Sequence, residues 1–339
     1  MVLMCLITST ITFSSSAQIK WKLQATSPTG SILVDQFTQV FSKLVEERSE
    51  GRLIIKVYPA SAIVPPLEVT SAVGKGIIEM GQGGPVYDIG SIPIAYVAAG
   101  LPFGWETSED TYEFWNLYKD GMALDMLNVP YHEKGVHNII LATFEDEYLA
   151  MTNFPVNTLE DWVGKKMRTT GVYGKLMSEL GAPTVNMSLP EVYMGIQTGT
   201  IDGAVAGISL LEEFKLKEVV DYVIRPAFSA CVGSTVYVNL DKWNSLSADL
   251  KEIVEKALHD AYANSLMPYS LELRDKTLNE AVRKNGIKII NLSEKEKERL
   301  RQAVVPIWEY VGGRSPQNTE LLDLLKEYLD FKGTPYPGK

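Results

Sequence analysis

An arginine at the end of a short strand-like run is the residue of this chain best suited to hold a small anion. Arg168 closes the run Gly164-Lys165-Lys166-Met167-Arg168, and a helical pattern begins after Gly171. A planar guanidinium can bind both oxygens of a carboxylate, and the free N–H groups of a helix start favour an anion at the same place. By spacing alone, pairing of Arg168 with a local acid such as Glu160 or Asp161 is the favoured interpretation.

The sequence shows no arrangement typical of an enzyme active site or a metal centre. Its three histidines, His132, His137 and His259, are not spaced as metal ligands, and no His-Glu-x-x-His run occurs. A Gly-x-Ser-x-Gly pattern for a nucleophilic serine is also absent. A triad assembled from distant positions would escape this search. We therefore predict no catalytic residues, no metal site and no cofactor, without excluding an enzyme.

Size and composition indicate a two-domain globular protein. The chain has 339 residues, of which 45% are hydrophobic, and a net charge of −10. That length suits two domains of ordinary size. The negative charge argues against nucleic acid as a partner and against a basic membrane-binding patch. No apolar run reaches the length of a transmembrane helix.

Residues 1–17 are interpreted as a secretory signal peptide. The segment is apolar, then rich in serine, and it ends in small residues at Ala17, as expected before a cleavage site. No Lys or Arg precedes the apolar run, which indicates a start codon a few residues further upstream. A disordered or buried N-terminal strand is the alternative. Cleavage would remove Cys5 and leave Cys231 as the only thiol, so the cysteines neither support nor exclude export.

Hydrophobic periodicity predicts an α/β domain in the first part of the chain. Residues 19–25, 53–58 and 77–81 are predicted as strands or their approaches, and 32–50 and 68–76 as helices. This order indicates a largely parallel sheet, beyond whose carboxyl ends ligands bind. The loops at those ends are 25–27, 60–62 and 83–88. In the last of them Tyr87 could offer a ligand its ring and hydroxyl, or it is half-buried in a plain turn.

Two segments are expected to carry the chain between its domains, and together they would form a hinge. The first follows the apolar strand 136–143, where the acids Glu145, Asp146 and Glu147 either form a solvated turn or place a carboxylate such as Glu147 in the cleft. The second is the apolar run 228–238. A helical region then extends from 248 to about 284, and Pro268 is expected to kink or break it.

Several short runs, in the same order along nearly the whole chain, match one protein family. They are Val45-Glu46-Glu47-Arg48-Ser49-Glu50-Gly51-Arg52-Leu53, Tyr58-Pro59, Glu68-Val69, Gly164-Lys165-Lys166-Met167-Arg168, Gly181-Ala182-Pro183, Glu191-Val192-Tyr193 and Gly199-Thr200-Ile201-Asp202-Gly203. With these runs the chain resembles the solute-binding proteins of TRAP (tripartite ATP-independent periplasmic) transporters.

The resemblance implies a two-lobe α/β periplasmic binding protein fold, with a hinge and a long helix that spans both lobes. We assign residues 18–148 and 235–280 to lobe I, and 149–234 and 281–334 to lobe II. The resemblance also implies that Arg168 clamps the carboxylate of a substrate, and we include the neighbouring Thr170 in the binding set. The protein would be a periplasmic binding subunit rather than an enzyme, a monomer that delivers its ligand to membrane permease subunits.

Departures from the family pattern bear on the ligand. Many members carry a second arginine after a Ser-Asn or Thr-Asn pair, where this chain has Phe154, and an acid-Asn pair after Asp-Gly, where it has Ala204-Val205-Ala206-Gly207. Two polar positions of the dicarboxylate and sialic-acid sites are thus apolar here. Since buried polar groups without partners are costly, we predict a monocarboxylate with an apolar or aromatic body. The residues predicted to line the pocket around this ligand are Phe154, Leu189, Ala206 and Phe214.

Two other functions are compatible with the same residues. One is the binding component of an ABC importer, or a sensor, for an organic acid. The other is a periplasmic enzyme acting on a carboxylate, such as a lyase or hydrolase. An enzyme would need a positioned acid–base pair in the cleft, and turnover of the bound acid would reveal it.

Overall fold

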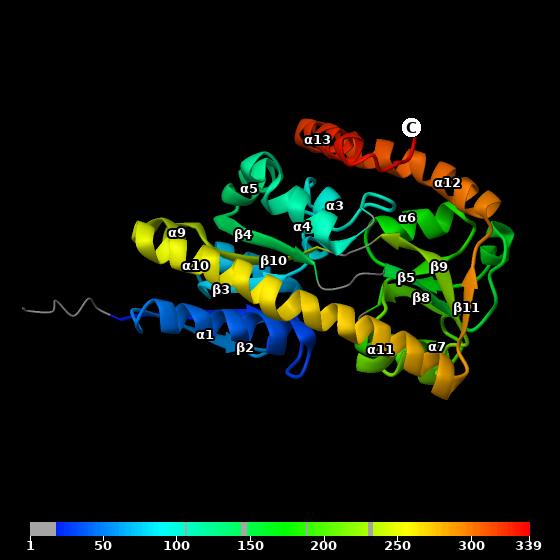
Figure 1. Ribbon diagram of the computed structural model, residues 1–339, viewed down its shortest axis with the longest axis horizontal. Coiled ribbons are helices and arrows are strands. Elements are labelled where there is room, and N and C mark those ends of the chain that lie inside the picture. The colour runs from blue at the N-terminus through cyan, green and yellow to red at the C-terminus, as the bar shows by residue number, and fades with distance from the viewer. Residues whose placement is uncertain (1–17, 106, 144–147, 188, 230–232) are drawn as a thin grey trace, which may run out of the picture.

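The chain forms two α/β lobes, each built on its own sheet (Figure 1). The computed structural model describes residues 18–105, 107–143, 148–187, 189–229 and 233–339. The predicted signal peptide, Glu147 and Cys231 lie outside these residues. None of the helices within the described part is both long and apolar enough to cross a membrane.

The first lobe contains a five-stranded sheet in the order β2-β1-β3-β10-β4. Its first three strands, β1 (Ile19–Ala25), β2 (Leu53–Tyr58) and β3 (Met80–Gly83), are parallel, as their apolar spacing predicted. The strand β10 (Gly233–Asn239) runs antiparallel to both β3 and β4 (Val136–Thr143). The expected parallel sheet is therefore interrupted by one reversed strand, which arrives from a distant part of the chain.

Helices cover both faces of this sheet. On one face, η1 and α1 pack with α10 around Trp21, Phe37 and Phe41. On the other face, α2, α4 and α5 pack around Phe114, Trp115 and Tyr131. The helices of this lobe are η1 (Leu33–Thr38), α1 (Gln39–Arg48), η2 (Pro66–Glu68), α2 (Val69–Gly74), η3 (Pro85–Tyr87), α3 (Ala95–Ala98), α4 (Ser108–Asn116), η4 (Tyr118–Gly121) and α5 (Met122–His132).

The second lobe contains a six-stranded sheet in the order β11-β9-β5-β8-β6-β7. Three neighbouring strands, β6 (Met167–Arg168), β7 (Thr184–Val185) and β8 (Gly203–Gly207), are parallel. On the other side of β8, β5 (Tyr148–Thr152) is antiparallel to both β8 and β9 (Tyr222–Ser229), and β11 (Lys288–Asn291) closes the edge. Its helices are η5 (Leu159–Trp162), α6 (Val172–Glu179), α7 (Leu189–Gln197), α8 (Leu210–Glu213) and η6 (Leu216–Glu218).

The chain passes from one sheet to the other between β4 and β5 and again between β9 and β10. After α9 (Leu240–Ser245), one long helix runs along both lobes (Figure 1), formed by α10 (Ala248–Ala261), η7 (Tyr262–Leu266) and α11 (Met267–Asn285). Pro268, predicted to kink or break this helix, does not break it. Instead, η7 makes a wider π turn in which Met267 N–H bonds to the Tyr262 carbonyl. This turn precedes the proline, which has no N–H to donate, and the helix continues.

The C-terminal helices cross the lobes once more. The first, α12 (Glu294–Gly312), packs on α6 and η5 of the second lobe, whereas α13 (Pro316–Lys332) packs on α3 and α5 of the first (Figure 1). We had assigned residues 281–334 to lobe II, so the assignment of α13 was wrong. Lys332 of α13 forms ion pairs of 2.9 Å with Asp110 and 3.0 Å with Glu113 of the first lobe. An amphipathic pattern shows that a helix buries one face, but not which lobe receives it.

Candidate functional site

The guanidinium of Arg168 is buried without an acidic partner among the described residues. Arg168 is 5% exposed at the carboxyl end of β6. Its Nε donates to the Met187 carbonyl at 3.1 Å, and its Nη1 donates to the Val205 carbonyl at 3.3 Å. These uncharged carbonyls orient the Arg168 guanidinium but do not neutralise its positive charge. A buried, uncompensated charge is unfavourable, so the site is suited to an anion brought from outside.

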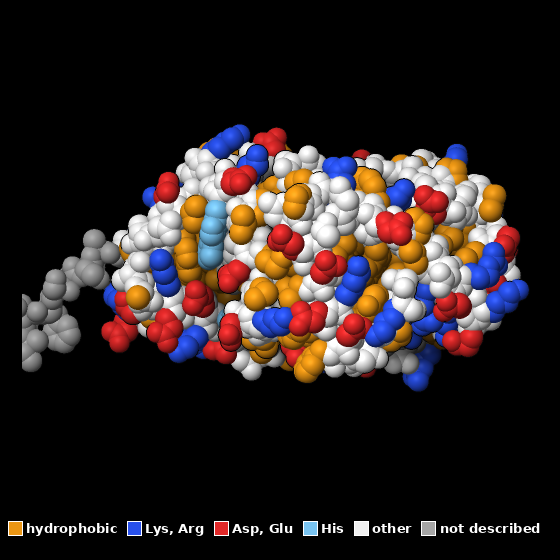
Figure 2. Space-filling model, turned by 90° about the horizontal axis from the view of Figure 1, so that it is seen from above, with side chains coloured by type: hydrophobic (Ala, Val, Ile, Leu, Met, Phe, Trp, Pro, Cys, Tyr) orange, Lys and Arg blue, Asp and Glu red, His pale blue; other side chains and the backbone are white. Residues whose placement is uncertain are grey.

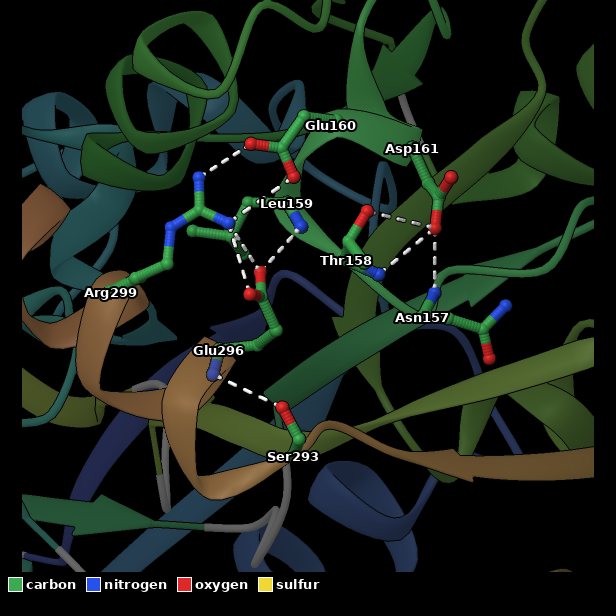
Figure 3. A network of polar contacts seen from close by, with 8 residues as sticks. All are labelled: Asn157, Thr158, Leu159, Glu160, Asp161, Ser293, Glu296 and Arg299. Carbon is green, nitrogen blue, oxygen red and sulfur yellow. Dashed lines mark hydrogen bonds and ion pairs between the residues drawn. The ribbon is translucent and has the colours of Figure 1, made fainter.

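The local acids proposed as partners of Arg168 are engaged elsewhere (Figure 3). Glu160 pairs with Arg299 of α12 through contacts of 2.5 and 3.2 Å, and this pairing lowers the pKa of Glu160 to about 2. Asp161 accepts from the backbone N–H groups of Asn157 and Thr158 at 2.8 and 2.9 Å, as part of a capping box. The interpretation favoured by spacing alone was therefore wrong.

The contacts in Figure 3 also hold η5, the short helix that precedes the strand of Arg168. Glu296 is 4% exposed, and its carboxylate accepts from the Leu159 N–H at 2.9 Å and from Arg299 at 2.9 and 3.0 Å. This clamp of Glu160, Glu296 and Arg299 joins α12 to η5. A shallow surface groove beside the clamp is lined in part by Val163 and Arg299 and does not include Arg168. We therefore assign the clamp a structural role.

Beyond Arg168, Gly171 brings the second lobe against the first. Its backbone has φ +56° and ψ −135°, a conformation that essentially only glycine adopts. A Cβ atom built on Gly171 would lie 3.3 Å from Cγ2 of Val86 in η3. The helix α6 starts immediately after it, with no side chain capping its first N–H groups. These groups and Arg168 together create a site of positive potential where the lobes meet.

The first lobe contributes the turn η3, which follows the carboxyl end of β3. Tyr87 is next to Val86 in this turn and is 43% exposed. Behind the turn, Asp88 is 8% exposed and accepts a 2.8 Å hydrogen bond from the hydroxyl of Tyr131. Burial raises the pKa of Asp88 to about 6, although hydrogen bonds from Tyr131 and Thr70 oppose the increase. We call Val86, Tyr87, Arg168, Thr170 and Gly171 the interlobe site.

Most of the other predicted residues follow the carboxyl ends of the parallel strands near Arg168. Leu189 begins α7, two residues after Met187. Ala206 follows Val205 in β8 and is fully buried. Phe214 follows α8 and is partly buried against the main core. Leu189 and Ala206 are thus next to the segments whose carbonyls hold the Arg168 side chain.

Phe154 lies at the end of the second-lobe sheet opposite to Arg168. Because β5 is antiparallel to β8 and pairs Thr152 with Gly203, Phe154 lies beyond the amino end of β8. Its ring packs edge-on against Trp162 at 5.8 Å, and the ammonium of Lys165 lies 4.8 Å from its centre. The structure therefore does not bring Phe154 together with Arg168. The sequence of β5 does not show the direction in which the strand runs, so the separation of the two residues could not be predicted.

Sequence reasoning missed three features of the site. The carbonyls of Met187 and Val205 carry no sequence signal, because every residue has such an acceptor. The sequence marks Gly171 only as the residue before a helix and does not show its closeness to Val86. Asp88 was named within a candidate loop but received no role, although an acid directly after an apolar turn is a signal that could have found it.

The chain forms two α/β lobes, and near their contact at Gly171 and Val86 lies a buried arginine with no acidic partner among the described residues. These features define a two-lobe solute-binding protein. The chain belongs to the bacterial extracellular solute-binding protein family 7, whose model matches residues 24–313. The resemblance to TRAP transporter solute-binding proteins is thereby confirmed. This family consists of binding proteins rather than enzymes.

Curated relatives and solved structures of this family match most of the chain. The monocarboxylate 2-oxoacid-binding periplasmic protein of Nostoc sp. is 28% identical over 272 residues, 78% of this chain and 73% of its own. The C4-dicarboxylate-binding periplasmic protein of Rhodobacter capsulatus is 26% identical over 280 residues, 81% of each chain. A TRAP solute-binding protein of Pseudoalteromonas atlantica, solved with sodium and pyruvate, has a TM-score of 0.82 at 23% identity, covering 93% of this chain and 94% of its own.

Proposed function

We propose that this protein is the periplasmic substrate-binding subunit of a TRAP transporter that captures a small monocarboxylate with an apolar or aromatic body. The lobes close around the acid, and the loaded protein delivers it to the membrane permease. The observation that carries this proposal is Arg168, a buried guanidinium oriented by two carbonyls and paired with no described acid.

The carboxylate of the ligand would bind the free edge of the Arg168 guanidinium. In a desolvated site such a charge-assisted pair is stronger than a neutral hydrogen bond and selects for planar anions. The first N–H groups of α6 add to the same potential. A lysine at position 168 would keep the charge but lose the two-pronged geometry.

The apolar body of the ligand is proposed from the residues around Arg168. The end of β8 runs through Ala204, Val205 and Ala206, all fully buried, and these residues offer no side-chain hydrogen bonds to a second anionic group or to several hydroxyls. Leu189 and Phe214, both partly buried, are the other apolar residues that we propose to contact the ligand. The relative from Nostoc sp., which binds monocarboxylate 2-oxoacids, supports the same substrate class.

Location in the periplasm and delivery to a permease are proposed from the family. Its curated relatives from Nostoc sp. and Rhodobacter capsulatus are periplasmic binding proteins. Acidic and basic side chains are interspersed over both lobes on the face in Figure 2. A bacterial two-hybrid or co-purification experiment with the membrane subunits of a TRAP transporter from the same organism tests the partnership, and failure to associate in the presence of ligand would contradict it.

The substrate class is tested by thermal unfolding of residues 18–339 against a panel of organic acids. A ligand present at a hundredfold excess over its Kd adds about 2.7 kcal/mol of stability, which gives a clear increase in Tm. We expect an increase with apolar or aromatic monocarboxylates and little with dicarboxylates or sugar acids. A larger increase with a dicarboxylate would overturn the proposed class, and chemical turnover of the bound acid would overturn the binding-protein function.

A further inference from the structure

A buried acid behind the first-lobe wall of the interlobe site has no role in the account above. Asp88 directly follows η3 and accepts from the Tyr131 hydroxyl at 2.8 Å. Thr70 of α2 also bonds to its carboxylate, and the Thr70 hydroxyl lies 3.1 Å from the hydroxyl of Tyr237 on β10. The cluster of Thr70, Asp88, Tyr131 and Tyr237 therefore joins three elements behind one turn.

The backbone of Asp88 is part of the same turn. Its N–H donates to the Pro85 carbonyl at 2.9 Å, and its own carbonyl accepts from Ser91 and Ile92 at 2.9 and 2.8 Å. Two residues earlier, Val86 makes the contact with Gly171 of the second lobe. A displacement of the Asp88 side chain from Tyr131 would thus shift the surface that meets the second lobe beside Arg168.

We propose that Asp88 is a positioning residue for ligand capture. Through its hydrogen bond with Tyr131, Asp88 holds the η3 turn in the place where the turn meets Gly171 when the lobes close. This inference rests on the proposed function and deepens it, because it identifies a residue that sets affinity without touching the ligand. The ionised carboxylate accepts from every hydroxyl directed at it. The neutral form must donate one hydrogen bond, so the cluster has to rearrange.

The surroundings of Asp88 give this role a pH dependence. The groups that interact with it are hydroxyls: Tyr131 from α5, Thr70 from α2 and Tyr237 from β10. Desolvation by these elements raises the pKa of Asp88 to about 6. Ligand affinity should therefore decrease as the pH falls through about 6, because the carboxylate that holds the turn becomes protonated.

Replacement of Asp88 by asparagine tests the proposal on the full mature chain. Asp88→Asn keeps the size of the side chain but cannot accept two hydroxyl donors through its amide nitrogen. With the acid that most stabilises the wild type, we expect roughly tenfold weaker binding at pH 7.5, equivalent to about 1.4 kcal/mol. We also expect the step in affinity near pH 6 to be lost, with no decrease in Tm. Damage to the fold alone would lower Tm and affinity together.

Two further variants separate positioning from general effects. Tyr131→Phe removes the anchoring hydroxyl and should weaken binding in the same direction. Asp110→Asn removes an acid of the same lobe that binds Lys332 at 2.9 Å, away from η3, and should lower Tm without changing affinity. Unchanged affinity in both Asp88→Asn and Tyr131→Phe would overturn the proposal.

Amide hydrogen exchange of the unliganded protein gives a result even if no acid binds. We expect faster exchange across residues 84–92 in Asp88→Asn than in the wild type at pH 7.5, and no such change in Asp110→Asn. Unchanged exchange across 84–92 would overturn the role of Asp88. Failure of the wild type to bind any acid would instead overturn the proposed function.

Discussion

Val86 of the first lobe and Gly171 of the second meet so closely that a Cβ on Gly171 would lie 3.3 Å from Cγ2 of Val86. The contact is three residues from Arg168 and two residues from Asp88. It therefore links the residue proposed to bind the carboxylate with the residue proposed to hold the opposite wall. Changes at this contact should act on ligand capture more than on the stability of either lobe.

Gly171→Ala should weaken ligand binding by roughly tenfold or more, because the alanine meets Val86 and strains a backbone conformation that costs a non-glycine residue about 1–3 kcal/mol. Titration calorimetry measures the loss. As a matched control, Gly164→Ala places a methyl at another positive φ of +77° with no neighbouring atom within 4 Å. It should lower Tm without a comparable loss of affinity. Equal affinities of wild type and Gly171→Ala would show that the lobes do not close on this contact.

Glu296→Ala should lower Tm by roughly 3 °C or more, because the buried N–H of Leu159 loses its acceptor and Arg299 loses a partner. Thermal unfolding followed by circular dichroism measures the effect. Glu298→Ala, which removes an exposed partner of Arg301, is the control and should change Tm little. If both variants unfolded at the same temperature, the clamp would not hold η5 to α12.

Asp88→Asn should stabilise the protein at neutral pH. The pKa of Asp88 is about 6 in the folded chain against an ordinary value of 3.8, so the folded state binds a proton more readily than the unfolded state. Stability from this group is present below pH 3.8 and is lost as the pH rises to about 6. The loss amounts to about 3 kcal/mol, and the variant should lack this slope in urea unfolding experiments.

His137 changes the free energy of unfolding with pH in the direction opposite to Asp88. Its contribution is the same in the wild type and in Asp88→Asn, so it cancels when the two are compared. Burial, together with His132 and Lys251, lowers the pKa of His137 from 6.5 to about 4. The unfolded state therefore takes up the proton first, and stability is lost as the pH falls from 6.5 to 4. We expect His137→Gln to remove that loss. A stability profile of His137→Gln that still declines over this range would contradict the assignment.

Phe154→Leu should lower Tm but leave ligand affinity within about twofold of the wild type, since the ring packs on Trp162 at the far end of the sheet. Titration with the preferred acid checks the affinity. A loss comparable to that of Gly171→Ala would return Phe154 to the binding set.

The sequence was informative where a residue's type and its neighbours decide its role. The sequence predicts Arg168 at a strand end and a long helix along both lobes, and the structure has both. The hydrophobic pattern could not show the direction of β5. This direction places Phe154 at the end of the sheet opposite to Arg168. The pattern also could not show against which lobe α13 packs. Nor could it show that Glu160 pairs with Arg299, which is more than a hundred residues away in the sequence. Such pairings depend on tertiary contacts that no local spacing encodes.

The binding of a carboxylate by Arg168 is tested by changing the protein and the ligand together. Calorimetry would compare the preferred acid with its neutral amide on the wild type, Arg168→Ala and Arg52→Ala, which removes a surface pair of 2.7 Å with Asp249. We expect the wild type and Arg52→Ala to prefer the acid by roughly a hundredfold or more. Arg168→Ala should bind the acid and the amide alike. An undiminished preference for the acid in Arg168→Ala would contradict the account.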